Sequence, residues 1–400
     1  MAASTATSSG VKTSFQKKGK TKAVQIKGTR PSLHNNLLIV SSGVPSFDFI
    51  LGGGIPVGSV ILIEEDTYGH HAHLLLRYFL AEGIMTDHQL FLASANEDPE
   101  KILKNLPYPV EGDKLLAEDA KTGADVSSVS EPMKIAWRYE CLPKVQDSAT
   151  SHKFGHSYDL SRTATSDLLS RVKTGTFHLS EEMKKETRSS HPFLCPTHQR
   201  LLERIEREIK DGEFHLTENA QSKQSLNRTV LRIGLQSYGS TLWWDEGYSN
   251  KVETSTSLCR FFHALRALLR NSLAVAMVTM PVHLLHDFVE VRRLERLCDA
   301  AVQIESFAGS EKETNPIFQD YHGLLHIKHL PRLNSLMVST PDSMDLGFKL
   351  KRKKLTIEKL HLPPEFSDSV SRPQEDTVLP SGGGGGAGCS STLQKRHLDF

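Results

Sequence analysis

The residues whose types bear most directly on chemistry follow a short apolar run, "SVILIE", at residues 59–64. A strand of this kind leads into a phosphate-binding loop of the form GxxxxGK[ST]. In that loop the glycines let backbone N–H groups surround phosphate, the lysine neutralises its charge and the hydroxyl holds Mg²⁺. Here the four diagnostic places are taken by Glu65, His70, His71 and Ala72. The loop stands where a nucleotide site belongs but lacks the residues that bind one.

Each of the four departures weakens phosphate binding. Glu65 places a carboxylate near the phosphate, and the Cβ of His70 disfavours the positive φ that a glycine adopts. His71 is mostly neutral at pH 7 and shorter than lysine, and Ala72 has no oxygen for Mg²⁺. We therefore expect a degenerate loop with no cofactor, no catalytic residue and no enzymatic activity of this chain alone. Hydrolysis of ATP by an assembly of several chains stays open.

The elements that position this loop are predicted from the apolar runs. Continuous runs are typical of strands covered on both faces, and they occur at 59–64, 90–95, 134–139, 230–236 and 273–280. Helical patterns occupy 73–84, 201–209 and 257–271; the last has apolar residues at 3,4,7 spacing with Arg260, Arg266 and Arg270 mostly off that stripe.

After residue 300 the pattern alternates, which is typical of antiparallel strands with one solvated face. The sequence predicts an α/β fold: a mostly parallel twisted sheet flanked by helices, with antiparallel edge strands near the C-terminus.

Composition divides the chain into three parts. Residues 1–36 are basic, rich in Ser and Thr and poor in apolar residues, so we expect disorder. Residues 37–362 form the predicted domain, with a polar insertion at about 110–225, and residues 363–400 are predicted to be a flexible Gly/Ser-rich tail.

Charge and cysteine content restrict the class of protein. The net charge of +1 gives no global attraction to nucleic acid or membrane, although the N-terminal segment is locally basic. The five cysteines form no CxxC pair, which favours a reducing compartment over a disulfide framework or a zinc ribbon. No secretory signal or membrane span is evident from the sequence.

The flanks of the loop carry a family resemblance. "SSGVPSFDFILGGGIPVGSVILIE" resembles the opening of the RecA/KaiC family, in which a Gly-Gly-Gly turn precedes the loop strand. "LFLASANEDPEKILKNL" is similar to the second strand of that family, where a glutamate activates the attacking water. Asn96 stands in the first acidic place, with Glu97 beside it, and an amide is not a base. The fold is thus expected to be RecA-like without the family's hydrolysis.

Longer strings resemble a narrower family, the fourth subunits of Elongator. These strings are "KIAWRY", "KFGHSYD", "ESFAGSEKETNPIFQDYHGLLHIKHLPRLNSL" and "FKLKRKKLTIEKLHLPPEFSDSVSR". The resemblance implies a hetero-hexameric ring shared with two RecA-like paralogous Elongator subunits, attached to the catalytic part of the complex. It also implies binding of tRNA, support of a carboxymethyl-type modification of the wobble uridine, and a cytoplasmic and nuclear location. No membrane partner is implied.

Two basic groups are candidates for contacts with RNA or with a neighbouring ring subunit. Lys328 and Arg332 lie where some RecA-like rings place a cation that reaches the neighbour's nucleotide, and surface charge is the alternative. The second group either binds tRNA phosphates or protects an edge strand from unwanted pairing. It consists of Lys349, Lys351, Arg352, Lys353 and Lys354.

The histidines and tryptophans admit two readings each. The "GHHAH" stretch has three histidines without a fourth ligand, which favours an ordinary loop over a zinc site. Trp137 is expected in the core, and Trp243 and Trp244 in a loop that contacts RNA or a paralogue.

Two other functions remain open from the sequence: a divergent ATPase subunit with composite nucleotide sites at ring interfaces, and a DNA-recombination accessory protein of RecA type.

Overall fold

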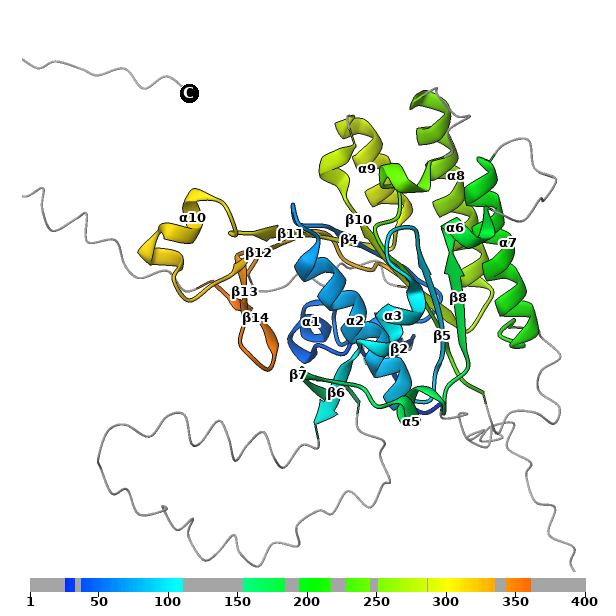
Figure 1. Cartoon of the computed structure of the whole chain (residues 1–400), viewed down its shortest axis with the longest axis horizontal. Coiled ribbons are helices and arrows are strands. Elements are labelled where there is room, and N and C mark those ends of the chain that lie inside the picture. Colours follow the sequence, from blue (N-terminus) through cyan, green and yellow to red (C-terminus); the bar gives the residue numbers. More distant parts are fainter. Residues whose placement is uncertain are drawn as a thin grey trace, which may run out of the picture. The chain divides into compact units, whose positions relative to one another are not determined.

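The computed structural model describes residues 26–32, 37–110, 154–183, 194–216, 228–244, 251–285, 287–334 and 343–360. Within these ranges the chain forms an α/β fold in which helices cover a large mixed sheet (Figure 1). None of the helices in these ranges has the length and apolarity needed to cross a bilayer.

The centre of the fold is a mostly parallel sheet of nine described strands in the order β14-β13-β12-β11-β4-β10-β9-β5-β8. The strands are β4 (Val60–Glu64), β5 (Gln89–Ser94), β8 (Thr174–His178), β9 (Leu231–Leu235), β10 (Ala274–Met280), β11 (Ala300–Ser306), β12 (Gly323–His329), β13 (Leu346–Leu350) and β14 (Leu355–Lys359). The strands from β11 to β8 run parallel, whereas β12, β13 and β14 are antiparallel to their neighbours. The predicted α/β class, with a parallel sheet and antiparallel strands near the C-terminus, is confirmed.

The apolar runs predicted as strands form the middle of this sheet. The runs at 59–64, 90–95, 230–236 and 273–280 correspond to β4, β5, β9 and β10, and every residue of these four strands is buried. Burial of both faces explains why these strands are continuously apolar rather than alternating. The predicted strand at 134–139 lies outside the described residues.

Helices cover the sheet from both sides (Figure 1). One face carries α1 (Pro45–Ile50), α2 (His70–Met85) and α3 (Pro99–Lys104); the other carries α7 (Pro196–Asp211), α8 (Lys251–Arg270) and α9 (Phe288–Leu297). Side chains alternate across the sheet accordingly. Ile61 and Ile63 pack with the α2 side, while Val60 and Leu62 pack with the α8 side.

The N-terminal part adds a small antiparallel sheet of β1 (Thr29–Pro31), β2 (Leu38–Val40) and β3 (Ile55–Pro56). Residues 26–32 fall within the segment predicted to be disordered. Their order comes from the backbone pairing of Thr29 with Val40 and from burial of Ile26. Just before α1, Gly43 packs closely against the backbone of Tyr78 of α2.

A buried polar network fastens this part to the sheet. The fully buried Arg232 of β9 donates from Nη1 to the backbone oxygen of Ser41 at 2.8 Å. Nearby, Glu82 of α2 accepts from His156 Nδ1 at 3.0 Å and from the Tyr158 hydroxyl at 2.6 Å. Burial opposes the ionisation of Glu82, yet the bonds from His156 and the charge of Arg232 hold its pKa below its ordinary value.

The stretch predicted as a polar insertion contributes elements to the main fold. Its described residues form β7 (Ser157–Thr163), paired with β6 (Pro107–Val110), then α5 (Ser166–Leu169), β8, α6 (Leu179–Glu182) and α7. The predicted helix at 201–209 lies within α7. β8 pairs with β5 at the edge of the sheet and buries only Gly175 and Phe177 fully, so its sequence shows no continuous apolar run.

The C-terminal side of the sheet has one irregularity. Ala301 of β11 faces His329 and Val302 faces Ile327, so Lys328 is an extra residue in β12, a β-bulge. The short elements η3 (Thr241–Trp243), η4 (Val282–Leu284), α10 (Glu311–Thr314) and η5 (Pro316–Phe318) complete the described secondary structure. The predicted tail at 363–400 and most of 1–36 lie outside the described residues.

Candidate functional site

The loop after β4 joins a buried strand to the first turn of a helix, as a phosphate-binding loop does. The strand ends at Glu64, and α2 begins at His70 after Gly69, whose φ of +69° suits glycine. His71 and Ala72 therefore lie in the first turn of α2. Of the four predicted positions, Glu65 and Ala72 are buried, His71 is half-buried and His70 is exposed.

A carboxylate of the chain itself occupies the N-terminus of α2. Oδ1 of Asp66 accepts from the backbone N–H of His71 at 3.2 Å and of Ala72 at 3.3 Å, and Oδ2 lies 3.4 Å from His71 Nδ1. Phosphate binds to a helix N-terminus through these same N–H groups. Burial would raise the pKa of Asp66, but the hydrogen bonds from His71 and Ala72 hold it below its ordinary value. Asp66 is thus an anion that is already bound at this position.

Glu65 is held by a second set of contacts at the carboxyl edge of the sheet. Its Oε1 accepts from the Ser237 hydroxyl at 2.9 Å and lies 3.2 Å from His73 Nε2, and Ser237 Oγ lies 2.8 Å from the same nitrogen. Ser237 has a φ of +46° and donates its N–H to Thr279 Oγ1 at 2.8 Å. These contacts tie together the ends of β4, β9 and β10, where parallel sheets bind ligands.

The Ser, His and Glu of this cluster do not form a nucleophile relay. In a triad the carboxylate orients the nitrogen of the imidazole that faces away from the serine. Here both Ser237 and Glu65 contact Nε2 of His73. The arrangement closes the loop by hydrogen bonds instead of activating the hydroxyl.

The other residues of the loop also have contacts with the protein. His71 packs its ring against Phe348, with ring centroids 4.7 Å apart, and the Glu97 carboxylate lies 3.7 Å from Arg77 of α2. Among the described residues, no group of three or more His, Cys, Asp or Glu side chains is arranged to hold a metal ion.

The basic residues predicted to contact RNA or a neighbouring ring subunit lie in two separate parts of the fold. Lys349 lies on β13, 3.3 Å from Glu358 of β14, with its ammonium 4.5 Å from the centre of the Tyr321 ring. Lys351, Arg352, Lys353 and Lys354 form the turn of the β13–β14 hairpin. β14 is the edge strand, as the sequence suggested, but the charges lie mainly in its turn.

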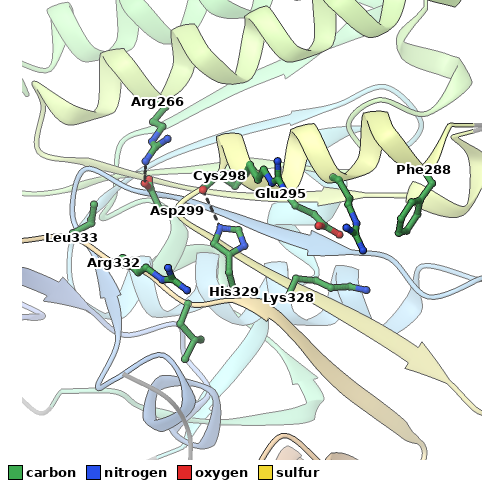
Figure 2. Close-up of a pocket in the computed structure, with 12 residues that line it drawn as sticks. Arg266, Phe288, Glu295, Cys298, Asp299, Lys328, His329, Arg332 and Leu333 are labelled. Carbon is green, nitrogen blue, oxygen red and sulfur yellow. Dashed lines mark hydrogen bonds and ion pairs between the residues drawn. The ribbon is translucent and has the colours of Figure 1, made fainter. Parts of the chain in front are cut away.

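Lys328 and Arg332 line a cavity of about 590 Å³ between α9 and the end of β12 (Figure 2). Five cationic and two acidic side chains line it: Arg266, Arg292, Arg296, Lys328, Arg332, Glu295 and Asp299. We call this cavity the basic pocket. Figure 2 shows Lys328 and Arg332 on the strand side and Phe288 at the far end of the helix side.

Buried carboxyl groups support the wall of the basic pocket. Asp299 accepts from Arg270 at 2.5 Å and from the backbone of Val60 at 2.9 Å, and it pairs with Arg266 at 2.9 Å. Beneath Glu295, burial and a hydrogen bond with that carboxyl raise the pKa of Glu64 to about 8, against the opposing charge of Lys328.

Sequence reasoning missed most of this pocket. Arg292 and Arg296 lie four residues apart on α9, which was not predicted, and i,i+4 spacing on one helix face was the signal that would have found them. The expected place of Trp243 was wrong: it is fully buried, and its ring is stacked with Phe177 at 6.3 Å. Trp244 packs beside it, partly exposed, and Trp137 lies outside the described residues.

The fold and this loop define an α/β protein with a mostly parallel sheet, in which the loop after β4 is held by its own carboxylates. The PAXNEB protein family model matches residues 22–400, and the chain belongs to that family.

Relatives that are similar along nearly the whole chain bear one name. "Elongator complex protein 4" of Xenopus laevis is 44% identical over 398 residues, covering 98% of this chain and 96% of the relative. The Homo sapiens protein of that name is 44% identical over 416 residues, covering 100% and 96%. That of Saccharomyces cerevisiae is 21% identical over 407 residues, covering 87% and 78%.

Proposed function

We propose that this protein is a non-catalytic subunit of the Elongator complex. In this proposal it alternates with two RecA-like paralogous subunits in a hetero-hexameric ring that attaches to the catalytic part of the complex. The ring binds tRNA and supports the carboxymethyl-type modification of the wobble uridine. The protein works in the cytoplasm and the nucleus, which imaging of the tagged chain tests.

One observation carries the non-catalytic part of the proposal. The Asp66 carboxylate takes the backbone N–H groups of His71 and Ala72, which a nucleotide phosphate would need. A phosphate brought to this loop meets Asp66 and Glu65, two buried carboxylates, at close range. The N–H groups that would bind phosphate already have an acceptor, and the nearby side chains carry negative instead of positive charge.

The subunit role is supported by the family. The relatives that are 44% identical over almost their full length are named for the Elongator complex. A chain that keeps the strand and helix of a nucleotide site but has a closed loop is suited to a structural role in a complex.

Native mass spectrometry of the gently purified, tagged full chain tests the assembly. The expected result is a complex of about six subunits that contains two other RecA-like proteins. A lone chain, or one bound to DNA-repair partners, would contradict the ring. Salt-matched competition between tRNA and single-stranded DNA on the same preparation tests the nucleic-acid preference, and preference for DNA would favour the recombination function.

A second candidate, a composite nucleotide site at a ring interface, is favoured by Lys328 and Arg332, which project from this chain into an open basic pocket. In that arrangement the assembled ring hydrolyses ATP although the isolated chain does not. Alanine at Lys328 and Arg332 then lowers hydrolysis by the ring at unchanged assembly. An assembled ring without hydrolysis would exclude this candidate.

A further inference from the structure

Within the described part of the chain, the basic pocket gathers cations that form no ion pair, although Glu295 lines the pocket and the charge of Lys328 acts on Glu64. Four cations on its walls are exposed, and none forms an ion pair within the described part of the chain: Arg292, Arg296, Lys328 and Arg332. Like charges held together repel each other, so their convergence costs free energy until an anion enters. The neighbouring Arg266 differs, because it forms an ion pair with Asp299, which it shares with Arg270.

The pocket is built on fixed elements. Arg292 and Arg296 share one face of α9, a turn apart. The β-bulge at Lys328 re-aims the end of β12, and His329 Nε2, 3.1 Å from the backbone oxygen of Cys298, ties that end to the segment before β11 (Figure 2). The backbone positions that carry the cations are therefore fixed before any ligand arrives.

An aromatic side chain adjoins the cations. Phe288, at the start of α9, is 66% exposed, and the guanidinium carbon of Arg292 lies 4.7 Å from the centre of its ring. A large apolar side chain left in water beside a row of cations offers a stacking surface next to phosphate-binding groups. Proteins that bind single-stranded nucleic acid use this combination: bases stack on aromatic rings while a basic groove follows the backbone.

We propose that the basic pocket binds an unpaired segment of RNA, with phosphodiester groups on the four free cations and a base stacked on Phe288. The choice of RNA over DNA rests on the proposed function; the choice of a single strand rests on the pocket. This assigns a direct RNA contact to this chain, made on α9 and the end of β12.

Two other anionic ligands fit the same pocket less well. A free nucleoside triphosphate with Mg²⁺ is held by a glycine-rich loop and a hydroxyl, and no glycine, serine or threonine lines this pocket. An acidic peptide would use the cations but has no planar base for Phe288. Stacked bases are recognised by an aromatic face, and phosphates by arginine.

The test measures binding of a fluorescent single-stranded RNA oligonucleotide to the full chain by anisotropy over a range of salt concentrations. Arg292→Ala and Arg296→Ala each lower the slope of log affinity against log salt by about 0.7, since each removes one phosphate contact. Phe288→Ala weakens binding about tenfold with little change in slope. Arg293→Ala is the matched control, because Arg293 is exposed on the same helix but outside the pocket.

Each outcome decides the proposal. Loss of affinity at the three pocket positions but not at Arg293 supports it, provided that circular dichroism shows the variants folded. Absence of RNA binding by the wild-type chain, or equal effects of all four substitutions, overturns it. Competition by ATP, polyglutamate, duplex RNA or single-stranded DNA as effective as by the RNA also overturns it. If native mass spectrometry finds no ring while the pocket binds RNA, the proposed assembly fails and this inference stands.

Discussion

Replacement of Asp66 tests whether a carboxylate of the chain itself holds the loop after β4. Asp66→Ala removes an acceptor from the backbone N–H groups of His71 and Ala72, of which the first is partly and the second fully buried in the first turn of α2. We expect the free energy of unfolding to fall, with no gain of ATP binding, because Glu65 remains in the loop.

The expected loss follows from the geometry. Loss of a helix cap costs about 0.5–2 kcal/mol, and a charge at a partly buried helix N-terminus adds up to about 2 kcal/mol. The capping bonds of Asp66 are 3.2 and 3.3 Å long, at the weak end of the range, so the lower half applies. We expect a loss of about 1–2 kcal/mol for Asp66→Ala. For Asp66→Asn, which keeps the acceptor, we expect a loss of less than about 1 kcal/mol.

Urea denaturation of the full chain at pH 7, followed by far-UV circular dichroism, measures these losses. Thr67→Ala, at the exposed neighbour in the same loop, is the control. Because the folded pKa of Asp66 is lowered, its charge stabilises the fold above its unfolded pKa of 3.8 and ceases to do so as pH falls through the folded value. The difference between wild type and Asp66→Asn should shrink in acid. If Asp66→Ala matched Thr67→Ala, the carboxylate would not be what holds the loop.

Three further changes are measured by the same denaturation. With the pKa of Glu64 raised from 4.5 to about 8, the stability that its neutral form provides falls as pH rises above 4.5 and is lost by about pH 8; Glu64→Gln should remove this decline, and an unchanged pH profile would contradict the assignment. Tyr158→Phe removes a 2.6 Å hydrogen bond to the buried Glu82 and should cost about 1–2 kcal/mol; a loss near zero would mean that another group satisfies the carboxylate. Gly43→Ala places a Cβ 2.4 Å from the backbone oxygen of Tyr78 at a φ of +84° and should cost at least about 2 kcal/mol; a stable variant would refute that packing.

The central fold could be predicted because its strands are buried on both faces. The run that forms β10 is apolar at nearly every position, and a continuous apolar run of this kind is typical of a strand that is buried on both faces. The edge strand β8 was not predicted, because it is only partly buried and has no continuous apolar run. Gly175 and Phe177 are its two fully buried residues, and pairing with β5 rather than an apolar sequence makes it a strand.

The sequence predicted that the loop is degenerate, but it did not identify Asp66 as the residue that occupies the N-terminus of α2. Comparison with the phosphate-binding motif identified Glu65 as a residue that repels phosphate, but the motif has no place for Asp66. Its role depends on the backbone angles that turn its carboxylate onto the N-terminus of α2. The partners of Glu65, His73 and Ser237, are 164 residues apart in sequence, a separation that no local pattern bridges.

The basic pocket could not be predicted from the sequence without knowledge of the fold. Lys328 was singled out from its segment, whereas Arg292 comes from a helix with two buried apolar residues, Val291 and Leu294. The helix has only ten residues and half of them are charged, so it was not identified in the sequence. Only the antiparallel return of β12 along β11 brings the two cations to one cavity.

The β-bulge at Lys328 makes the pocket sensitive to the length of the chain and not only to its composition. Along a strand, side chains alternate between the two faces, so a shift of one residue exchanges them. Deletion of Lys328 would cause no such shift, because Ala301 already faces His329 and Val302 already faces Ile327; it would remove the bend in β12 and one of the cations. A change in length of one residue would thus keep the sheet and its register but change the direction in which the end of β12 approaches the pocket.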